Sequence, residues 1–293
     1  MIYLIGSIIL TSYLTLSFKV TQQHNLPDTQ VLFFVSVFSA LTCLIINGSF
    51  VVPAKGVGKE WFIWSIVIGF LFIVLYLLIA LTTQKIGVAI AAASNRLSLI
   101  IPFVFSTIYY DEKATAGKIV GIGIVLIAVV MICWPPGRKA FTFKKVDVLK
   151  ITFLPALIFI GSGLRDTLVK YVQQQYLVER NQFLFLFFSF ASAAAFGLLY
   201  MMIQLATRKE QFDKKSIVAG IIIGIPAYFA FWCMILFLKE YEQRSGAVIP
   251  IHNITIVILT TLIAVWLFKE KLSVINWLGI GLSMIGILLV GLN

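Results

Sequence analysis

Apolar runs of about 20 residues recur along almost the whole chain, and they constrain the fold more than any other feature of the sequence. An α-helix needs about 20 such residues to cross the hydrocarbon core of a bilayer. We therefore predict an all-α membrane protein with ten transmembrane helices, joined by short polar connections. The ten expected spans are residues 1–18, 31–52, 61–82, 87–109, 119–134, 151–169, 183–206, 216–238, 246–268 and 274–292.

The composition excludes the other broad classes of protein. Hydrophobic residues make up 60% of the 293 residues and charged residues 12%, whereas soluble domains have about 45–50% and about 25%. Such a chain could neither cover a soluble surface with polar groups nor stay disordered. The net charge of +11 comes mostly from Lys and Arg in the short connections. These side chains meet lipid headgroups there, so we expect the lipid bilayer as a partner and no nucleic acid.

The second half of the sequence repeats the first. With an offset of 158 residues, polar and glycine positions match in the same order without a gap. We therefore predict two five-helix repeats, residues 1–137 and residues 138–293. Because five is an odd number of spans, the second repeat enters the membrane from the opposite side, and inverted repeats of this kind are the architecture of secondary transporters. The matched pairs include Asn95 with Asn253, Glu112 with Glu270, Lys113 with Lys271, Gly121 with Gly279 and Gly123 with Gly281.

The end of each half carries a short signature. The sequence YDEK at residues 110–113 is followed by Gly121 and Gly123. The sequence FKEK at residues 268–271 is followed by Gly279 and Gly281. Both resemble the EamA-type domains of the drug/metabolite transporter superfamily, and the resemblance covers essentially the whole chain. It implies a central cavity lined chiefly by the first, third and fourth helices of each half, with the fifth and tenth helices packed together. It does not identify a substrate.

The matched glycines and glutamates have structural interpretations. Gly121, Gly123, Gly279 and Gly281 would permit close backbone approach between the fifth and tenth helices, although glycine is also simply common in membrane helices. The matched glutamates, at positions 112 and 270, lie beside lysines in short turns. A carboxylate in such a turn usually caps a helix or forms a surface ion pair.

Arg96 is the most costly residue in the fourth span. It lies nine residues after Gly87, which puts it roughly 13 Å into the bilayer. An arginine there costs about 3 kcal/mol, so it should face the interior of the bundle and have a partner. Its guanidinium is a planar, bidentate match for a carboxylate. We therefore predict that Arg96 and its polar neighbour Asn95 bind an anionic group of the substrate.

A second charged group is embedded in the sixth span, where Arg165 and Asp166 are adjacent. Two interpretations of Asp166 stay open. It could form a structural ion pair with Arg96, Arg165 or Lys170, since buried charges are normally paired. It could instead be the proton-coupling residue, with Arg165 helping Arg96 to attract the substrate.

The eighth and ninth spans supply the remaining candidates. Pro250 should loosen the ninth span, and His252 and Asn253 follow it closely. His252 is either a proton relay or substrate ligand or a neutral histidine bonded between helices. In the eighth span, Tyr228 and Trp232 could form an aromatic wall for the substrate or could simply pack in the core.

Nothing in the sequence indicates an enzyme, a metal site or a cofactor. The chain has two histidines that do not form a pair, three cysteines without metal-ligand spacing and no phosphate-binding loop. We expect a secondary active transporter, an exporter or exchanger, that moves a small organic metabolite such as an amino acid or organic anion by alternating access at a central cavity. A multidrug or cation exporter and a non-transporting scaffold are the alternatives.

The expected setting is the cell (inner or plasma) membrane, with a small-molecule substrate, protons as a candidate coupling partner, and a monomer or homodimer as the assembly. The two signals for orientation disagree. The odd-numbered connections carry more Lys and Arg than the even-numbered ones, which favours termini outside the cytoplasm. The family resemblance implies cytoplasmic termini.

Overall fold

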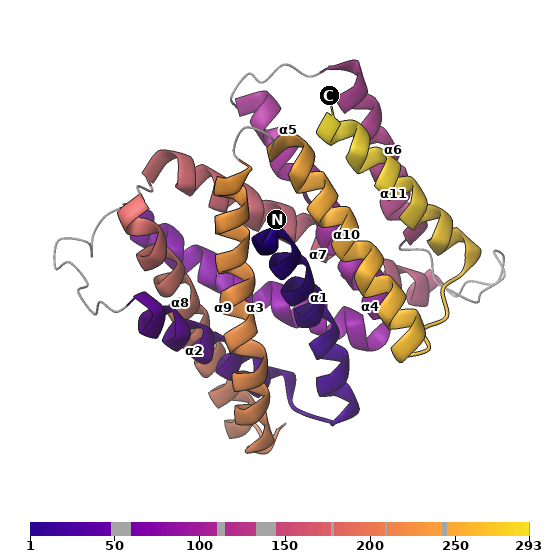
Figure 1. Ribbon diagram of the computed structural model, residues 1–293. Helices are drawn as coiled ribbons and strands as arrows, with labels where there is room; N and C mark the ends of the chain where they lie inside the picture. The colour runs from indigo at the N-terminus through magenta and orange to yellow at the C-terminus, as the bar shows by residue number, and fades with distance from the viewer. Residues whose placement is uncertain are drawn as a thin grey trace.

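The computed structural model describes residues 1–47, 60–109, 115–132, 145–176, 179–208, 210–241 and 245–292, and its regular structure there is entirely α-helical (Figure 1). This confirms the all-α fold. The helices are α1 (Ile2–Gln23), α2 (Asp28–Asn47), α3 (Glu60–Lys85), α4 (Val88–Leu97), α5 (Ile100–Tyr109), α6 (Ala116–Ile132), α7 (Lys145–Tyr176), α8 (Glu179–Ala206), α9 (Lys215–Glu240), α10 (Ser245–Leu267) and α11 (Val274–Leu292).

Five helices are long and apolar enough to cross a membrane by length and composition, within the described residues. They are α1, α2, α3, α9 and most of α8. Shorter apolar stretches lie in α4 to α5, α6, α10 and α11. Many large apolar side chains are exposed on the outside of these helices, as a surface in contact with lipid requires.

The fourth expected span is two helices rather than one. Helix α4 ends at Leu97 and α5 begins at Ile100. Pro102 explains the break, because it lacks the N–H that would bond to the carbonyl of Ser98, and its ring clashes with that carbonyl. The Ser98 carbonyl accepts a tighter bond from the N–H of Ile101 instead, at 2.9 Å. By contrast, the helical assignment of α10 continues on both sides of Pro250.

The larger helix contacts of one half repeat in the other. Helix α1 packs on α9 and α10 as α7 packs on α3 and α4, and α2 packs on α9 as α8 packs on α3. The pairs α2 and α8, α4 and α10, and α6 and α11 each join equivalent helices. Exchanging the halves therefore leaves this set of contacts unchanged, which is the pattern that a pseudo-two-fold axis produces. The repeat boundary predicted at residues 137 and 138 lies outside the described residues.

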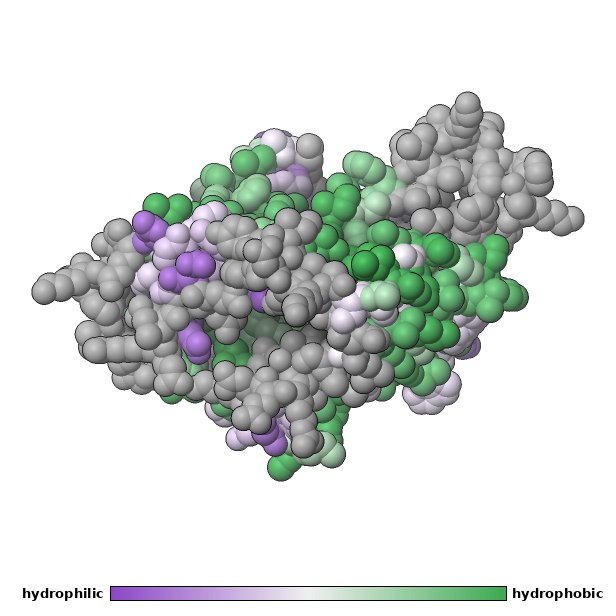
Figure 2. All heavy atoms as spheres, turned by 90° about the horizontal axis from the view of Figure 1, so that it is seen from above, coloured by the Kyte–Doolittle hydropathy of each residue, from purple (hydrophilic) through white to green (hydrophobic). Residues whose placement is uncertain are grey.

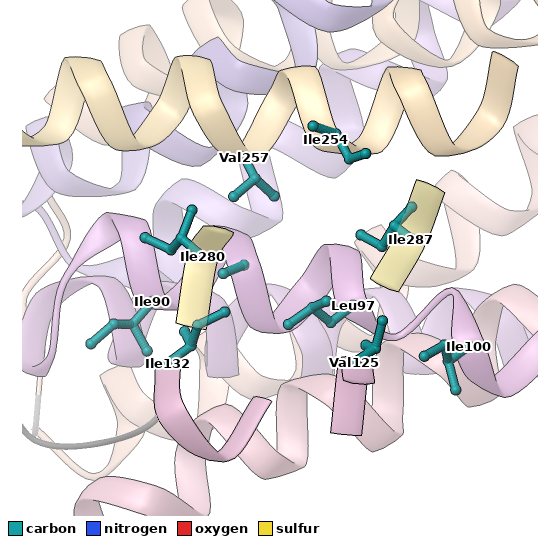
Figure 3. Close-up of a cluster of buried hydrophobic side chains, with 10 residues drawn as sticks. Ile90, Leu97, Ile100, Val125, Ile132, Ile254, Val257, Ile280 and Ile287 are labelled. Carbon is teal, nitrogen blue, oxygen red and sulfur yellow. The ribbon is translucent and has the colours of Figure 1, made fainter. Parts of the chain in front are cut away.

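The fifth and tenth spans, α6 and α11, pack along each other beside α4 and α10, as the resemblance implied. Isoleucine, valine and leucine side chains from both halves fill the space between them (Figure 3). The labelled residues are Ile90 and Leu97 of α4, Ile100 of α5, Val125 and Ile132 of α6, Ile254 and Val257 of α10, and Ile280 and Ile287 of α11.

Two of the four matched glycines lie in this helix contact and two do not. A Cβ on Gly279 would lie 2.9 Å from the backbone nitrogen of Ile132, and a Cβ on Gly286 would lie 3.1 Å from the carbonyl oxygen of Gly121. A Cβ on Gly123 or Gly281 would meet nothing within 4 Å. The assignment of helix packing to those two glycines is therefore corrected, because both lie on exposed faces of their helices.

Candidate functional site

Polar residues at neighbouring positions of the two repeats meet where α4 packs on α10. Arg96 Nη1 of α4 donates a hydrogen bond to Asn253 Oδ1 of α10 at 3.3 Å, and Asn253 is only 6% exposed. Asn253 is the repeat partner of Asn95, the residue just before Arg96. The break after Leu97 places this contact at the end of a half-helix, which is where transporters commonly build binding sites.

Helix α7 adds an ion pair between adjacent residues. Arg165 Nε and Nη2 both donate to Asp166 Oδ1, at 2.9 and 2.7 Å. The Arg165 guanidinium also lies 5.7 Å from the centre of the Phe72 ring on α3, within the range of a cation–π interaction. Of the basic partners considered for Asp166, the structure therefore pairs it with Arg165.

These charges form one electrostatic group. The charges of Asp166 and Arg165 both act on the Arg96 guanidinium. The Asp166 side chain is 36% exposed although it lies ten residues before the end of α7, which is about 15 Å along the helix. An exposed carboxylate at that depth is tolerated where it faces water inside the bundle rather than lipid. We call Arg96, Arg165, Asp166 and Asn253 the central charged group.

His252 lies next to this group and is bonded between helices. Its Nε2 is 3.0 Å from Ser7 Oγ of α1, and its ring packs 4.9 Å from the ring of Phe237 on α9. His252 is 4% exposed, and the charge of Arg96 acts on it. This geometry agrees with a histidine held between helices, while its place beside Arg96 keeps it a candidate ligand.

Tyr228 and Trp232 belong to an aromatic cluster between α2, α8 and α9. Tyr228 is fully buried, and Trp232 packs edge-on against Tyr3 of α1 and Phe229 at ring distances of 6.3 and 6.0 Å. No contact that the structure describes joins either residue to Arg96. In this conformation they pack in the core, and their role as substrate ligands stays a prediction.

Sequence reasoning missed Ser7 and Phe72, which contact His252 and Arg165 respectively. Both are residue types that occur throughout apolar helices, so their importance is visible only from their neighbours in space. Asn95 was predicted, and its buried Oδ1 has no hydrogen-bond partner within the described part of the chain. In the same part of the chain, no group of three or more His, Cys, Asp or Glu side chains could hold a metal ion.

Apolar helices arranged as two equivalent halves around a central charged group define a multi-pass integral membrane protein of the transporter class. The chain belongs to the EamA-like transporter family, whose model matches residues 1–134 and 144–292. A solved structure with 14% sequence identity shares the fold, with a TM-score of 0.63 over 98% of this chain and 94% of that chain.

Two curated proteins are similar in sequence. An uncharacterised protein of Haemophilus influenzae is 26% identical over 222 residues, which cover 74% of this chain and 71% of that protein. A probable 4-amino-4-deoxy-L-arabinose-phosphoundecaprenol flippase subunit ArnE of Hamiltonella defensa is 39% identical over 85 residues, which cover 28% of this chain and 72% of that protein. The flippase subunit belongs to the drug/metabolite transporter superfamily, which agrees with the resemblance in the signature residues.

Proposed function

We propose that this EamA-family transporter is a secondary active carrier of a small organic anion or zwitterion, such as an amino acid, and works by alternating access. The observation that carries the proposal is the net positive charge of the central charged group. It holds two guanidinium groups and one carboxylate, and Arg165 donates two hydrogen bonds to that carboxylate. The bond that Arg96 donates goes to a neutral amide.

A substrate carboxylate beside Arg96 would balance this charge. Guanidinium binds carboxylate bidentately, and the bond is strong where water is scarce. The unpartnered Oδ1 of Asn95, one residue away, would accept a hydrogen bond from a substrate ammonium. Together the two residues supply complementary groups for the two ends of an amino acid.

Asp166 is the proposed proton carrier. Both bonds from Arg165 go to Oδ1, and we expect a proton or a substrate amine to bind at Oδ2. The side chain is partly exposed, so it can exchange protons with water in the cavity. None of these roles involves covalent chemistry. We place the carrier in the cell (inner or plasma) membrane.

The test is ligand-dependent thermal stabilisation of the purified protein with amino acids, organic acids, phosphate esters and lipophilic cations. A ligand at 100 times its Kd stabilises by about 2.7 kcal/mol. We expect anions or zwitterions to stabilise the protein, Arg96→Ala to lose the effect, and the exposed control Lys214→Ala to keep it. Stabilisation by lipophilic cations alone would contradict the proposal and favour multidrug export.

A second candidate is translocation of a lipid-linked sugar phosphate. The similarity to the probable flippase subunit favours it, and a phosphate group would bind Arg96 as a carboxylate does. A polyprenyl phosphate in the same panel distinguishes the two. If it stabilises the protein and water-soluble anions do not, the lipid-linked substrate replaces the metabolite.

A further inference from the structure

The start of α4 is capped by a residue from the other half of the protein. Glu270, in the connection between α10 and α11, accepts hydrogen bonds from Val88 N at 2.7 Å and from Ala89 N at 3.3 Å. These N–H groups have no acceptor within their own helix. A carboxylate at this positive end of a helix is favourable. We call these two bonds the α4 cap.

The local backbone is shaped for this contact. Gly87, just before α4, has φ +143°, a conformation that side chains disfavour, and a Cβ there would lie 2.9 Å from Glu270 Oε2. Glu270 is also not needed by its own helix. Helix α11 starts with a reciprocal cap in which Asn276 N donates to Ser273 Oγ at 3.2 Å and Ser273 N donates to Asn276 Oδ1 at 2.9 Å. The α4 cap is therefore a contact between the halves.

The α4 cap lies at one end of the bundle together with other bonds between connections. We call this the sealed end, and it comprises residues 24–30, 82–89, 207–208, 210–214 and 268–273. Gln84 Nε2 donates to Asp28, at 2.7 and 2.8 Å, and Thr29 donates to Glu210. Gln30 accepts a bond from Asp213 N at 2.9 Å and donates one to the Gln211 carbonyl at 2.7 Å. Four connections between helices are thus tied together.

Figure 2 looks onto the opposite end, where apolar residues cover much of the described surface. The N-terminal amine of Met1 pairs there with Glu240 Oε1 at 2.7 Å. Helix α4 connects the sealed end to the central charged group, because Arg96 follows Val88 by eight residues on one short helix. A movement of the capped end of α4 would therefore move Arg96.

We infer that Glu270 is a gating residue of the transport cycle: the α4 cap holds the sealed end closed and must release before the central site opens to that side. The repeat supplies its counterpart. The residues equivalent to Glu270, Val88 and Ala89 are Glu112, Gly246 and Ala247, and the last two start α10 at the other end of the bundle. Glu112 lies outside the described residues. From the repeat alone, we expect Glu112 to act at the opposite end as Glu270 acts at the sealed end.

This inference rests on the proposed alternating access and not on the substrate, so the experiment uses no substrate. Thr83, fully buried at the sealed end, is replaced by cysteine in a full-length chain whose native cysteines are alanine. A second reporter, Val169→Cys, lies three residues after Asp166 on α7 and is half-buried. Each is labelled with a membrane-impermeant maleimide in vesicles of known orientation, Thr83→Cys from the sealed side and Val169→Cys from the opposite side.

We expect Glu270→Ala to raise labelling of Thr83→Cys by about 2- to 30-fold, the range that loss of a helix cap gives, and to lower labelling of Val169→Cys. Opposite changes at the two ends identify a gate. Faster labelling at Thr83 with no change at Val169 would mean local fraying of α4 and would overturn the inference, as would no change at either. If Glu270→Ala fails to reach the membrane, Glu270→Gln, which keeps one acceptor, decides on the same readout.

Failure of the proposed substrate class and failure of the proposed gate give different results. Failure of every anion to stabilise the protein removes the proposed substrate class but leaves the two-ended labelling interpretable. Labelling that never shifts between the ends, even in Glu270→Gln and Glu112→Ala, removes the gate. In that case ligand binding at Arg96 can still be measured.

Discussion

At the scale of single residues, the site is defined by two guanidinium groups and one carboxylate, which is bonded to only one of them in the described structure. Arg165 holds Asp166 by two bonds to the same oxygen, and Arg96 is held by the amide of Asn253. A charged pair inside a membrane protein adds little net stability but costs much when one partner is removed. Because Asp166 is partly exposed, water compensates for part of that loss. Its charge is therefore available for function.

Asp166→Asn should separate proton coupling from binding. Asparagine keeps the shape and an acceptor for Arg165 but cannot carry a proton. Solvent screening limits the loss of stability to about 1 kcal/mol. We expect proton-driven uptake to be lost while exchange of labelled for unlabelled substrate continues in proteoliposomes. Proton-driven uptake at the wild-type rate would show that Asp166 is only a structural partner of Arg165.

Gly87→Ala should destabilise the protein, whereas Gly123→Ala should not. Gly87 has a φ of +143°, which alanine disfavours, and a Cβ there would also press against the Glu270 carboxylate. Backbone strain of this kind costs about 1–3 kcal/mol. At Gly123 the added methyl enters open space on a regular helix, where alanine is favoured by up to about 1 kcal/mol. Thermal melting in one detergent compares the two, and an equal effect of both would refute the strain at Gly87.

Part of the candidate site could be predicted from the sequence because charge in an apolar span is costly. That cost identified Arg96, Arg165 and Asp166, and the repeat added Asn253. The contribution of Ser7 could not be predicted, since one serine among the several in α1 differs from the others only by the residue it faces. Whether these residues bind substrate stays a prediction.

At the scale of helices, the break between α4 and α5 determines where Arg96 lies. Helix α4 has only ten residues, so Arg96 sits in its last turn rather than in the middle of a long helix. The carbonyls that the break leaves without helical partners can bond to side chains or water in a cavity. The short helix thus couples the position of Arg96 to the sealed end.

Pro102→Ala should join α4 and α5 into one helix. Alanine restores the N–H and is favoured over proline in a helix interior by about 3 kcal/mol, so the melting temperature should stay equal or rise. We expect the ligand-induced thermal shift to fall, because the turn that carries Arg96 would change direction. A stable variant with the full ligand-induced shift would mean that the break does not position the site.

The helix positions could be predicted from apolar length, but the break could not. The run from residue 87 to residue 109 is long enough for one span, and a proline alone does not decide where a membrane helix breaks. Pro250 illustrates this, since α10 continues through it. What matters is whether neighbouring groups accept the altered backbone, and that depends on packing between the halves.

At the scale of the whole molecule, the larger helix contacts are symmetric between the halves and the smaller ones are not. The larger helix contacts are exchanged with the halves, whereas α3 also packs on α1, α2 and α4 without an equally large counterpart at α9 in the described part of the chain. The described connections at one end are tied together. An inverted repeat can adopt the same asymmetry in reverse at little cost, because each half can take the conformation of the other. The balance between the two states then depends on small differences between equivalent contacts.

The double variant Glu112→Ala with Glu270→Ala tests this balance. Each single substitution should shift the equilibrium by about 2- to 30-fold, since a helix cap is worth about 0.5–2 kcal/mol, and the two shifts should have opposite signs. In the double variant the two shifts should cancel, so the labelling ratio of Thr83→Cys to Val169→Cys should lie within about threefold of the ratio in the parent protein. If both single variants shift the ratio in the same direction, the two glutamates are not equivalent gates, and the symmetry of the helix contacts does not extend to the cycle.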